Sequence, residues 1–162
     1  MATSMAALSA QFDLHTKLFN NVLDGITDAD ASTQHADSVN HMKWIAGHIL
    51  NTRLNSLCKM AGIPHDASLA LLFGKDAKLS ADVAYPSMNE IKERWNTNAP
   101  LLAEALTHIP ADKLAAKSPA TVPINDDTVL GTLAFLVAHE SHHIGQLSVL
   151  RKMLGKPAMS YN

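Results

Sequence analysis

Three histidines within five positions, His139, His142 and His143, are the residues best suited to chemistry, and they lie in the segment HESHHIGQ. If this segment is helical, His139 and His143 stack on neighbouring turns and His142 points elsewhere, because side chains four positions apart share a face. Such a pair can bind a divalent metal ion. Alternatively, the two imidazoles are buried and hydrogen bonded to their neighbours, since an unsatisfied buried polar group costs about 1–3 kcal/mol. The spacing leaves both interpretations open.

A metal site needs a third ligand from another helix, and His48 is the best candidate. It lies in the segment WIAGHILNT, on a face that it shares with Ile45 and Thr52. His41, one heptad earlier, has a similar orientation but lies nearer the start of the helix. The remaining histidines are predicted to be helix-surface or loop residues: His15, His35, His65 and His108.

Counting ligands excludes two other kinds of metal site. A di-iron carboxylate site needs two Glu-x-x-His pairs and two further glutamates, whereas Glu140 and His143 form the only such pair in the sequence. Structural zinc sites favour several cysteines, and Cys58 is the only one. What remains is one ion with three neutral imidazole ligands and open positions for water or substrate.

The side chains around the pair have further possible roles. His142 can shuttle protons beside a metal, although a solvated surface position is favoured. Glu140 projects near the apolar side of the helix, where it can orient an imidazole, act as a base, or form a salt bridge at the rim. Gly145 is predicted to allow close approach of another helix, since glycine inside a helix costs about 1 kcal/mol relative to alanine. Gln146 is predicted to have a structural role, with a hydrogen bond to a ligand histidine as the alternative.

Four helical segments position these residues, and no segment shows the alternation of a strand. The predicted helices run from about Ser4 to Asp24, from Ser38 as N-cap to Gly62, from Ser87 towards Pro110, and from about Asp127 to Leu154. In the last of them, projection at ~100° per residue places His143 at the centre of an apolar stripe and His139 at its edge. The sequence therefore predicts one all-α domain spanning residues 1–162.

Two long connections separate these helices. Residues 62–86 join the second helix to the third, far more than the ~2–8 residues usual between helices. This length permits a crossover, so we expect a four-helix bundle with a long crossover link between helices 2 and 3. The LALLF segment within it is predicted to form a short helical turn, and residues 109–127 are predicted to be a surface loop.

Composition narrows the partners and the compartment. Apolar residues make up 47% of the 162 residues, and the formal net charge is −2. No segment concentrates Lys or Arg, which argues against nucleic acid. No stretch reaches the roughly 18 apolar residues of a membrane span, and the N-terminus lacks the pattern of a signal peptide. The single cysteine fits a reducing compartment, so we expect a cytoplasmic protein.

The motifs W-x-x-x-H, at Trp44 and His48, and H-x-x-H-H-x-G-Q, which begins at His139, resemble those of the DinB-like superfamily. The resemblance implies a four-helix bundle with a long link between the second and third helices. It also implies a metal, zinc or nickel, held by three histidines that correspond to His48, His139 and His143. Homodimers are common in this family. Characterised relatives include transferases and isomerases that use low-molecular-weight thiols.

Three functions are therefore compared. The favoured one is a metal-dependent enzyme acting on small molecules, since a divalent ion held by neutral histidines can lower the pKa of a thiol or of water. Attack by a thiol would give S-transfer, and attack by water would give hydrolysis. The alternative is a non-catalytic, metal-binding or stress-associated dimeric module. A phosphotransfer domain that uses His142 is disfavoured, because no Lys follows until Lys152.

Overall fold

A computed structural model describes residues 2–63 and 67–162, and this part of the chain is all-helical with no strand. The prediction of an all-α protein is confirmed. The long helices are α1 (Ala2–Val22), α3 (Met42–Thr52), α6 (Met88–Thr107) and α8 (Val129–Met153). The shorter elements are α2 (Asp28–Ala31), η1 (Arg53–Cys58), α4 (Lys59–Ala61), η2 (Ala67–Leu69), α5 (Ala70–Phe73) and α7 (Ala111–Ala115).

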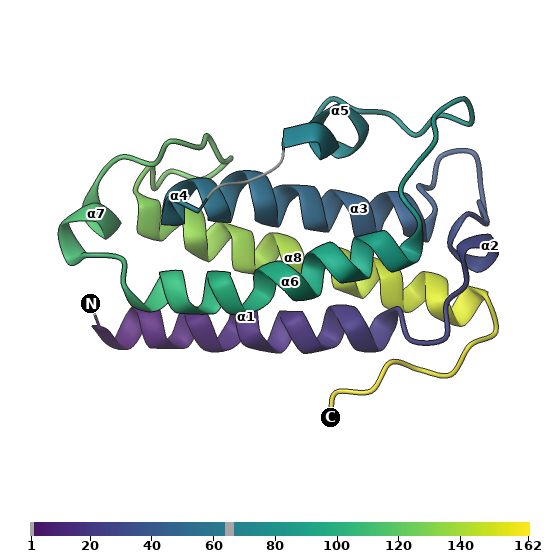
Figure 1. The fold of residues 1–162 in the computed structure, drawn as a ribbon, viewed down its shortest axis with the longest axis horizontal. Helices are drawn as coiled ribbons and strands as arrows, with labels where there is room; N and C mark the ends of the chain where they lie inside the picture. Colours follow the sequence, from purple (N-terminus) through teal and green to yellow (C-terminus); the bar gives the residue numbers. More distant parts are fainter. Residues whose placement is uncertain (1, 64–66) are drawn as a thin grey trace.

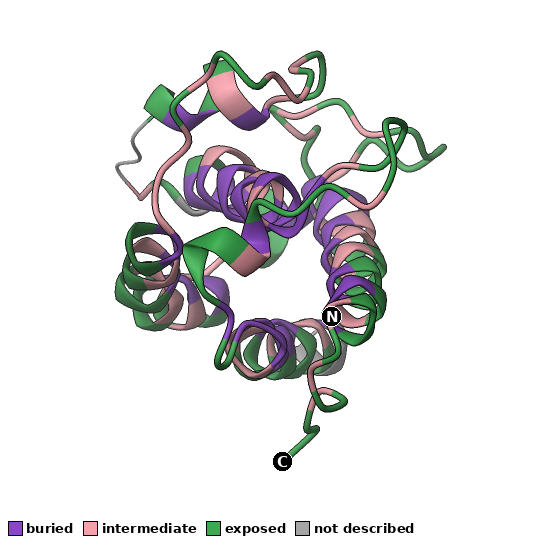
Figure 2. Ribbon diagram, turned by 90° about the vertical axis from the view of Figure 1, so that its right-hand side faces the viewer, coloured by how far each residue is buried: buried purple, intermediate pink, exposed green. Residues whose placement is uncertain are grey.

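The long helices lie side by side (Figure 1). Helix α1 packs against both α6 and α8, and α3 packs against α8 and α6. Viewed along the helices, the buried residues face the centre of the molecule and the exposed residues face outward (Figure 2). The short helix α5 lies on the outer side of α3 and contacts it. No helix in the described ranges is long and apolar enough to cross a membrane.

Local sequence signals explain most of the helix ends. Ser87 and Glu90 form the predicted capping box at the start of α6, and Thr128 caps α8 through the backbone N–H of Gly131. The second long helix differs from its prediction, because its N-cap is His41 and not Ser38. The Nδ1 atom of His41 accepts a hydrogen bond from the backbone N–H of Trp44.

The second long helix also changes its winding halfway. After α3, residues Arg53–Cys58 form a π-helical stretch before α4 completes the helix. Turns of this kind are often found at functional positions. The first residue of the stretch, Arg53, has its side chain in the core, where it is only 1% exposed. The hydrophobic pattern predicts a plain helix here, so the π-helical stretch is a feature that the sequence analysis missed.

The two long connections contain more structure than loops. The predicted helical turn in LALLF is confirmed, since η2 and α5 lie there and Phe73 is fully buried. The prediction of a surface loop over residues 109–127 is wrong in part. This segment contains α7, whose Leu114 is buried, and a single antiparallel bridge joins Lys117 to Thr128.

Candidate metal centre

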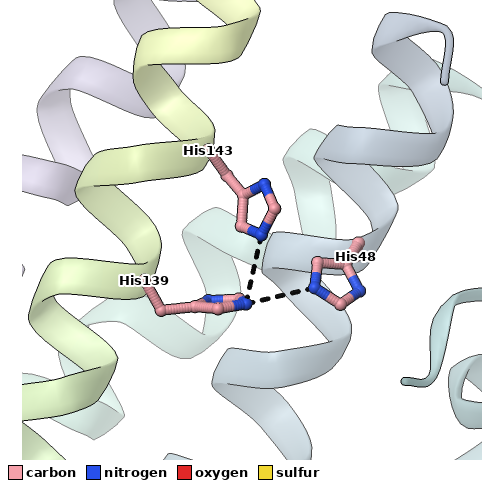
Figure 3. A group of neighbouring side chains, drawn as sticks. All are labelled: His48, His139 and His143. Carbon is pink, nitrogen blue, oxygen red and sulfur yellow. Dashed lines mark hydrogen bonds between the residues drawn. The ribbon is translucent and has the colours of Figure 1, made fainter. Parts of the chain in front are cut away.

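Three histidines from two helices converge on one point. His48 comes from α3, and His139 and His143 come from neighbouring turns of α8 (Figure 3). The Nε2 atom of His139 lies 3.1 Å from Nε2 of His48 and 3.2 Å from Nε2 of His143. One ligand nitrogen from each ring can be chosen so that all three lie within 4.8 Å of one another. The structure thus brings together the three residues predicted from the sequence.

The second nitrogens of two of these rings fix their protonation. Nδ1 of His48 lies 2.7 Å from the backbone oxygen of Phe73, and Nδ1 of His143 lies 2.7 Å from Oε1 of Gln146. An oxygen of either kind can only accept, so each Nδ1 carries the proton and donates. In a neutral ring, the Nε2 atoms of His48 and His143 therefore present lone pairs towards His139.

A single proton on His139 cannot satisfy both of these lone pairs. If Nε2 of His139 carries its proton, that proton serves one neighbour well, and Nδ1 is left as a buried atom without a partner among the described residues. If Nδ1 carries it, three lone pairs face one another. With the proton on Nδ1, a divalent cation can bind the three lone pairs, because neutral imidazole nitrogens are common metal ligands. Ligands at ~2.0–2.1 Å around a tetrahedral ion lie about 3.3 Å apart, which the observed nitrogen spacings approach.

The environment keeps these imidazoles neutral. Burial, with smaller contributions from the neighbouring histidines, lowers the pKa of His139 from 6.5 to about 4. Burial also lowers the pKa of His143 to about 4, against the opposing effect of its hydrogen bond to Gln146. Burial lowers the pKa of His48 as well. At neutral pH the cluster therefore presents unprotonated nitrogens, which metal binding requires.

The position of His48 depends on packing between α3 and α5. A Cβ atom at Gly47 would overlap the ring of Phe73, so only glycine lets that ring lie against α3. This close approach brings the backbone oxygen of Phe73 within reach of His48. On its other side, His48 stacks on Trp44, with ring centroids 5.2 Å apart and planes 6° from parallel. The W-x-x-x-H motif therefore describes a stacked pair one helical turn apart.

Comparison with known proteins supports this site. The family model described as the DinB superfamily matches residues 11–147, a range that contains all three histidines. The chain belongs to the DinB superfamily. No curated protein matches it. Membership in the DinB superfamily and the three-histidine cluster together fit a metal-binding protein.

Of the three roles left open for Glu140, the salt bridge is the one observed, and it lies in the core and not at the rim. The side chain of Glu140 is 1% exposed and accepts hydrogen bonds from Arg53, at 2.8 Å from Nε and 2.7 Å from Nη2. Burial alone would raise the pKa of this carboxyl, but the Arg53 guanidinium and the hydrogen bond from His15 bring it below its ordinary value. Glu140 therefore orients core groups and not the histidines of the cluster.

His15 is a second correction. It was predicted to lie on a surface, yet it is 3% exposed and its Nδ1 lies 3.2 Å from Oε2 of Glu140. The spacing of His15 could have predicted its burial. It lies three positions after Phe12 and four before Phe19 on the same helix face, and both phenylalanines are buried. A polar residue on that face needs a buried partner, which α8 provides.

The predictions for the rest of HESHHIGQ have mixed outcomes. His142 is exposed, as favoured from the sequence. Gly145 is also exposed and has no atom near its missing side chain, so the predicted close approach of a helix is wrong. Gln146 takes the alternative role, the hydrogen bond to a histidine of the cluster. His143 is half-buried and does not lie at the centre of the buried face, which Glu140 and Leu147 occupy.

The other histidines lie outside the cluster. His41 caps α3, His108 ends α6 in an exposed position, and His35 lies in the loop before α3. His65 falls outside the described residues.

Proposed function

We propose that this protein is a divalent-metal-dependent enzyme that acts on small molecules, with zinc or nickel held by His48, His139 and His143. A thiol S-transferase that uses a low-molecular-weight thiol is the favoured activity, and hydrolysis is the second possibility. One observation carries the proposal. The Nε2 atoms of His48 and His143, both hydrogen-bond acceptors, converge on Nε2 of His139 with no proton arrangement that satisfies them all.

A divalent ion at this position would supply a Lewis acid that lowers the pKa of a thiol or water molecule beside it. The protein's own residues prepare the site for that ion. The Phe73 carbonyl and the Gln146 side chain hold the rings of His48 and His143 in one orientation. Such supporting hydrogen bonds fix the tautomer and raise the basicity of a ligand histidine. The parallel Trp44 ring covers one face of His48 and keeps water from it.

The architecture proposed around the site is that of the DinB superfamily. We propose that α1, the α3–α4 helix, α6 and α8 form a single four-helix-bundle domain, with a crossover link between α4 and α6. We further propose a cytoplasmic homodimer, by analogy with the family. Measuring the mass of the purified protein by light scattering tests the dimer.

Metal content tests the first part of the proposal. Protein purified without chelator, and protein stripped and then reloaded with zinc, nickel or cobalt, should bind one ion per chain. His143→Ala should abolish this binding. His142→Ala is the matched control, because it removes an exposed histidine from the adjacent position of the same helix and should leave metal content unchanged. Full metal binding by His143→Ala would refute the site.

Spectroscopy separates an enzyme from a binding module. The cobalt or nickel form is titrated with a panel of low-molecular-weight thiols, and the visible spectrum is recorded. A thiolate-to-metal charge-transfer band that appears with one of these thiols supports S-transfer. If no such band appears with any thiol of the panel, in protein that carries its metal, the non-catalytic dimeric module is favoured.

A further inference from the structure

A groove of about 500 Å³ starts at His143 and Gln146 and follows α8 towards its C-terminal end. Residues 35, 36 and 38–40 and the first turn of α3 form its opposite wall. His143 to Met153 spans ten positions, which is ~15 Å of helix. The volume of the groove falls in the range of small-molecule sites, ~300–1,000 Å³. The groove is therefore long enough for an extended ligand that reaches the histidine cluster.

The chemistry of the lining is uncharged and largely apolar. Trp44, Ile45 and Leu150 are buried along it, and Val149 and Met153 face it while remaining 59% and 56% exposed. No Asp, Glu, Lys or Arg lines the groove among the residues that the structure describes. A charged ligand would lose its hydration there without gaining an ion pair. The groove therefore favours an uncharged ligand with an apolar chain or ring.

Two polar atoms of the groove's lining residues are left without partners. The indole N–H of Trp44 and Nε2 of His35 are buried and make no hydrogen bond in the described structure. Trp44 is only 8% exposed and stacks on His48. An unpaired buried donor costs about as much as a lost hydrogen bond. A ligand oxygen that reached the indole N–H would remove that cost next to the histidine cluster.

We propose that this groove is the substrate site, and that it binds an uncharged molecule that joins a carbonyl-type acceptor to an apolar chain of up to ~15 Å. The acceptor lies at the Trp44 and His143 end, and the chain lies along Val149 and Met153. This inference rests on the proposed function, because it assigns a substrate class to the same site.

A series of straight-chain alkanamides, from butanamide upward, tests the proposal by isothermal titration of the metal-loaded protein. Affinity should rise about fourfold per added methylene until the chain reaches the length of the groove. Alkylammonium ions of matched length should bind at least tenfold more weakly. An affinity that does not depend on chain length overturns the proposal.

Variants of exposed groove residues locate the binding. Val149→Glu and, independently, Met153→Glu place a charge in the groove. Each should abolish the rise in alkanamide affinity with chain length. Leu101→Glu is the matched control, because Leu101 is 47% exposed on α6 and lies outside the groove. Trp44→Phe keeps a ring against His48 but removes the N–H, and should weaken every amide about threefold to tenfold.

Measurements on the same samples separate this proposal from the proposed function. If Val149→Glu and Met153→Glu both bind the amides like the unchanged protein, the groove is not the site. If they change the oligomeric state in light scattering while amide binding is unchanged, the groove is a contact between copies of the chain, and the proposal is wrong. If the protein carries its metal and responds to thiols but binds no amide, only the groove fails. If it carries no metal, the proposed function fails.

Discussion

Replacement of Glu140 by glutamine tests whether a buried ion pair holds the histidine-bearing helix in place. Arg53 and Glu140 are each 1% exposed and share two hydrogen bonds of 2.7 and 2.8 Å. The Arg53 guanidinium also lies 3.5 Å from the ring centroid of Trp95 and donates to the Thr16 hydroxyl. Glu140→Gln preserves this shape but leaves the arginine without its counter-charge in a site that water does not reach.

Breaking a buried pair from one side typically costs about 3–5 kcal/mol. A domain of this size is stabilised by only about 5–15 kcal/mol in total. Each kcal/mol lowers Tm by about 2–4 °C in domains of 150–250 residues, so we expect Glu140→Gln to lower Tm by about 6–20 °C. Thermal unfolding followed by circular dichroism measures Tm, and urea unfolding measures the free energy of unfolding.

Two further variants make this test specific. Glu104→Gln applies the same change to an exposed glutamate of α6 and should stay within about 0.5 kcal/mol of the unchanged protein. The double variant Arg53→Met with Glu140→Gln removes both charges, so it should cost less than the sum of the two single variants. A loss below about 1 kcal/mol in Glu140→Gln, or strict additivity in the double variant, would refute the reasoning.

The remaining predictions concern the candidate metal centre and the packing around it. Gln146→Leu removes the acceptor of the Nδ1–H group of His143 and should weaken metal binding about 10–100-fold. Gln146→Glu retains an acceptor and should preserve the metal affinity, which metal titration measures. Gly47→Ala should lose about 1–3 kcal/mol of stability against the Phe73 ring, while Gly145→Ala, in open space on α8, should gain up to about 1 kcal/mol in the same urea unfolding assay. Because burial lowers the pKa of His143 from 6.5 to about 4, the contribution of His143 to the stability of the metal-free protein should fall as the pH drops from about 6.5 to about 4 and then stay constant. Metal affinity should for the same reason hold steady down to about pH 5.5, and a decline beginning near pH 6.5 would contradict the lowered pKa.

The sequence predicts the histidine cluster better than it predicts the surroundings of the cluster. The i, i+4 spacing of His139 and His143 is a local property of any helix, and His48 needed only the correct face of its own helix. The carbonyl partner of His48 comes from Phe73, at the end of a link whose path no local pattern determines. The glycine that admits Phe73 is likewise unremarkable in the sequence, because its role depends on a contact 26 positions away.

Buried polar residues explain why the helical projection of α8 centred the buried face on His143, whereas the structure centres it on Glu140. An apolar stripe drawn through Val129, Leu136 and Leu150 omits Glu140 and Arg151, both of which are buried. Restoring them moves the centre of the buried face to Glu140, about 60° from His143 on a helix of ~100° per residue. The apolar side chains of α8 do not gather on one face, so hydrophobic patterning could not fix its rotation.

Two polar contacts accompany this rotation of α8, and they link the core to the candidate metal centre. Glu140 pairs with Arg53, and its neighbour His139 meets His48 about 100° further round α8. Arg53 and His48 belong to the same continuous helix, in which the π-helical stretch begins at Arg53. One pair of helices thus makes two polar contacts, a buried ion pair and a histidine cluster. We expect the ion pair to hold the register in which the imidazoles converge, so its loss in Glu140→Gln should weaken metal binding even at temperatures where the variant is fully folded.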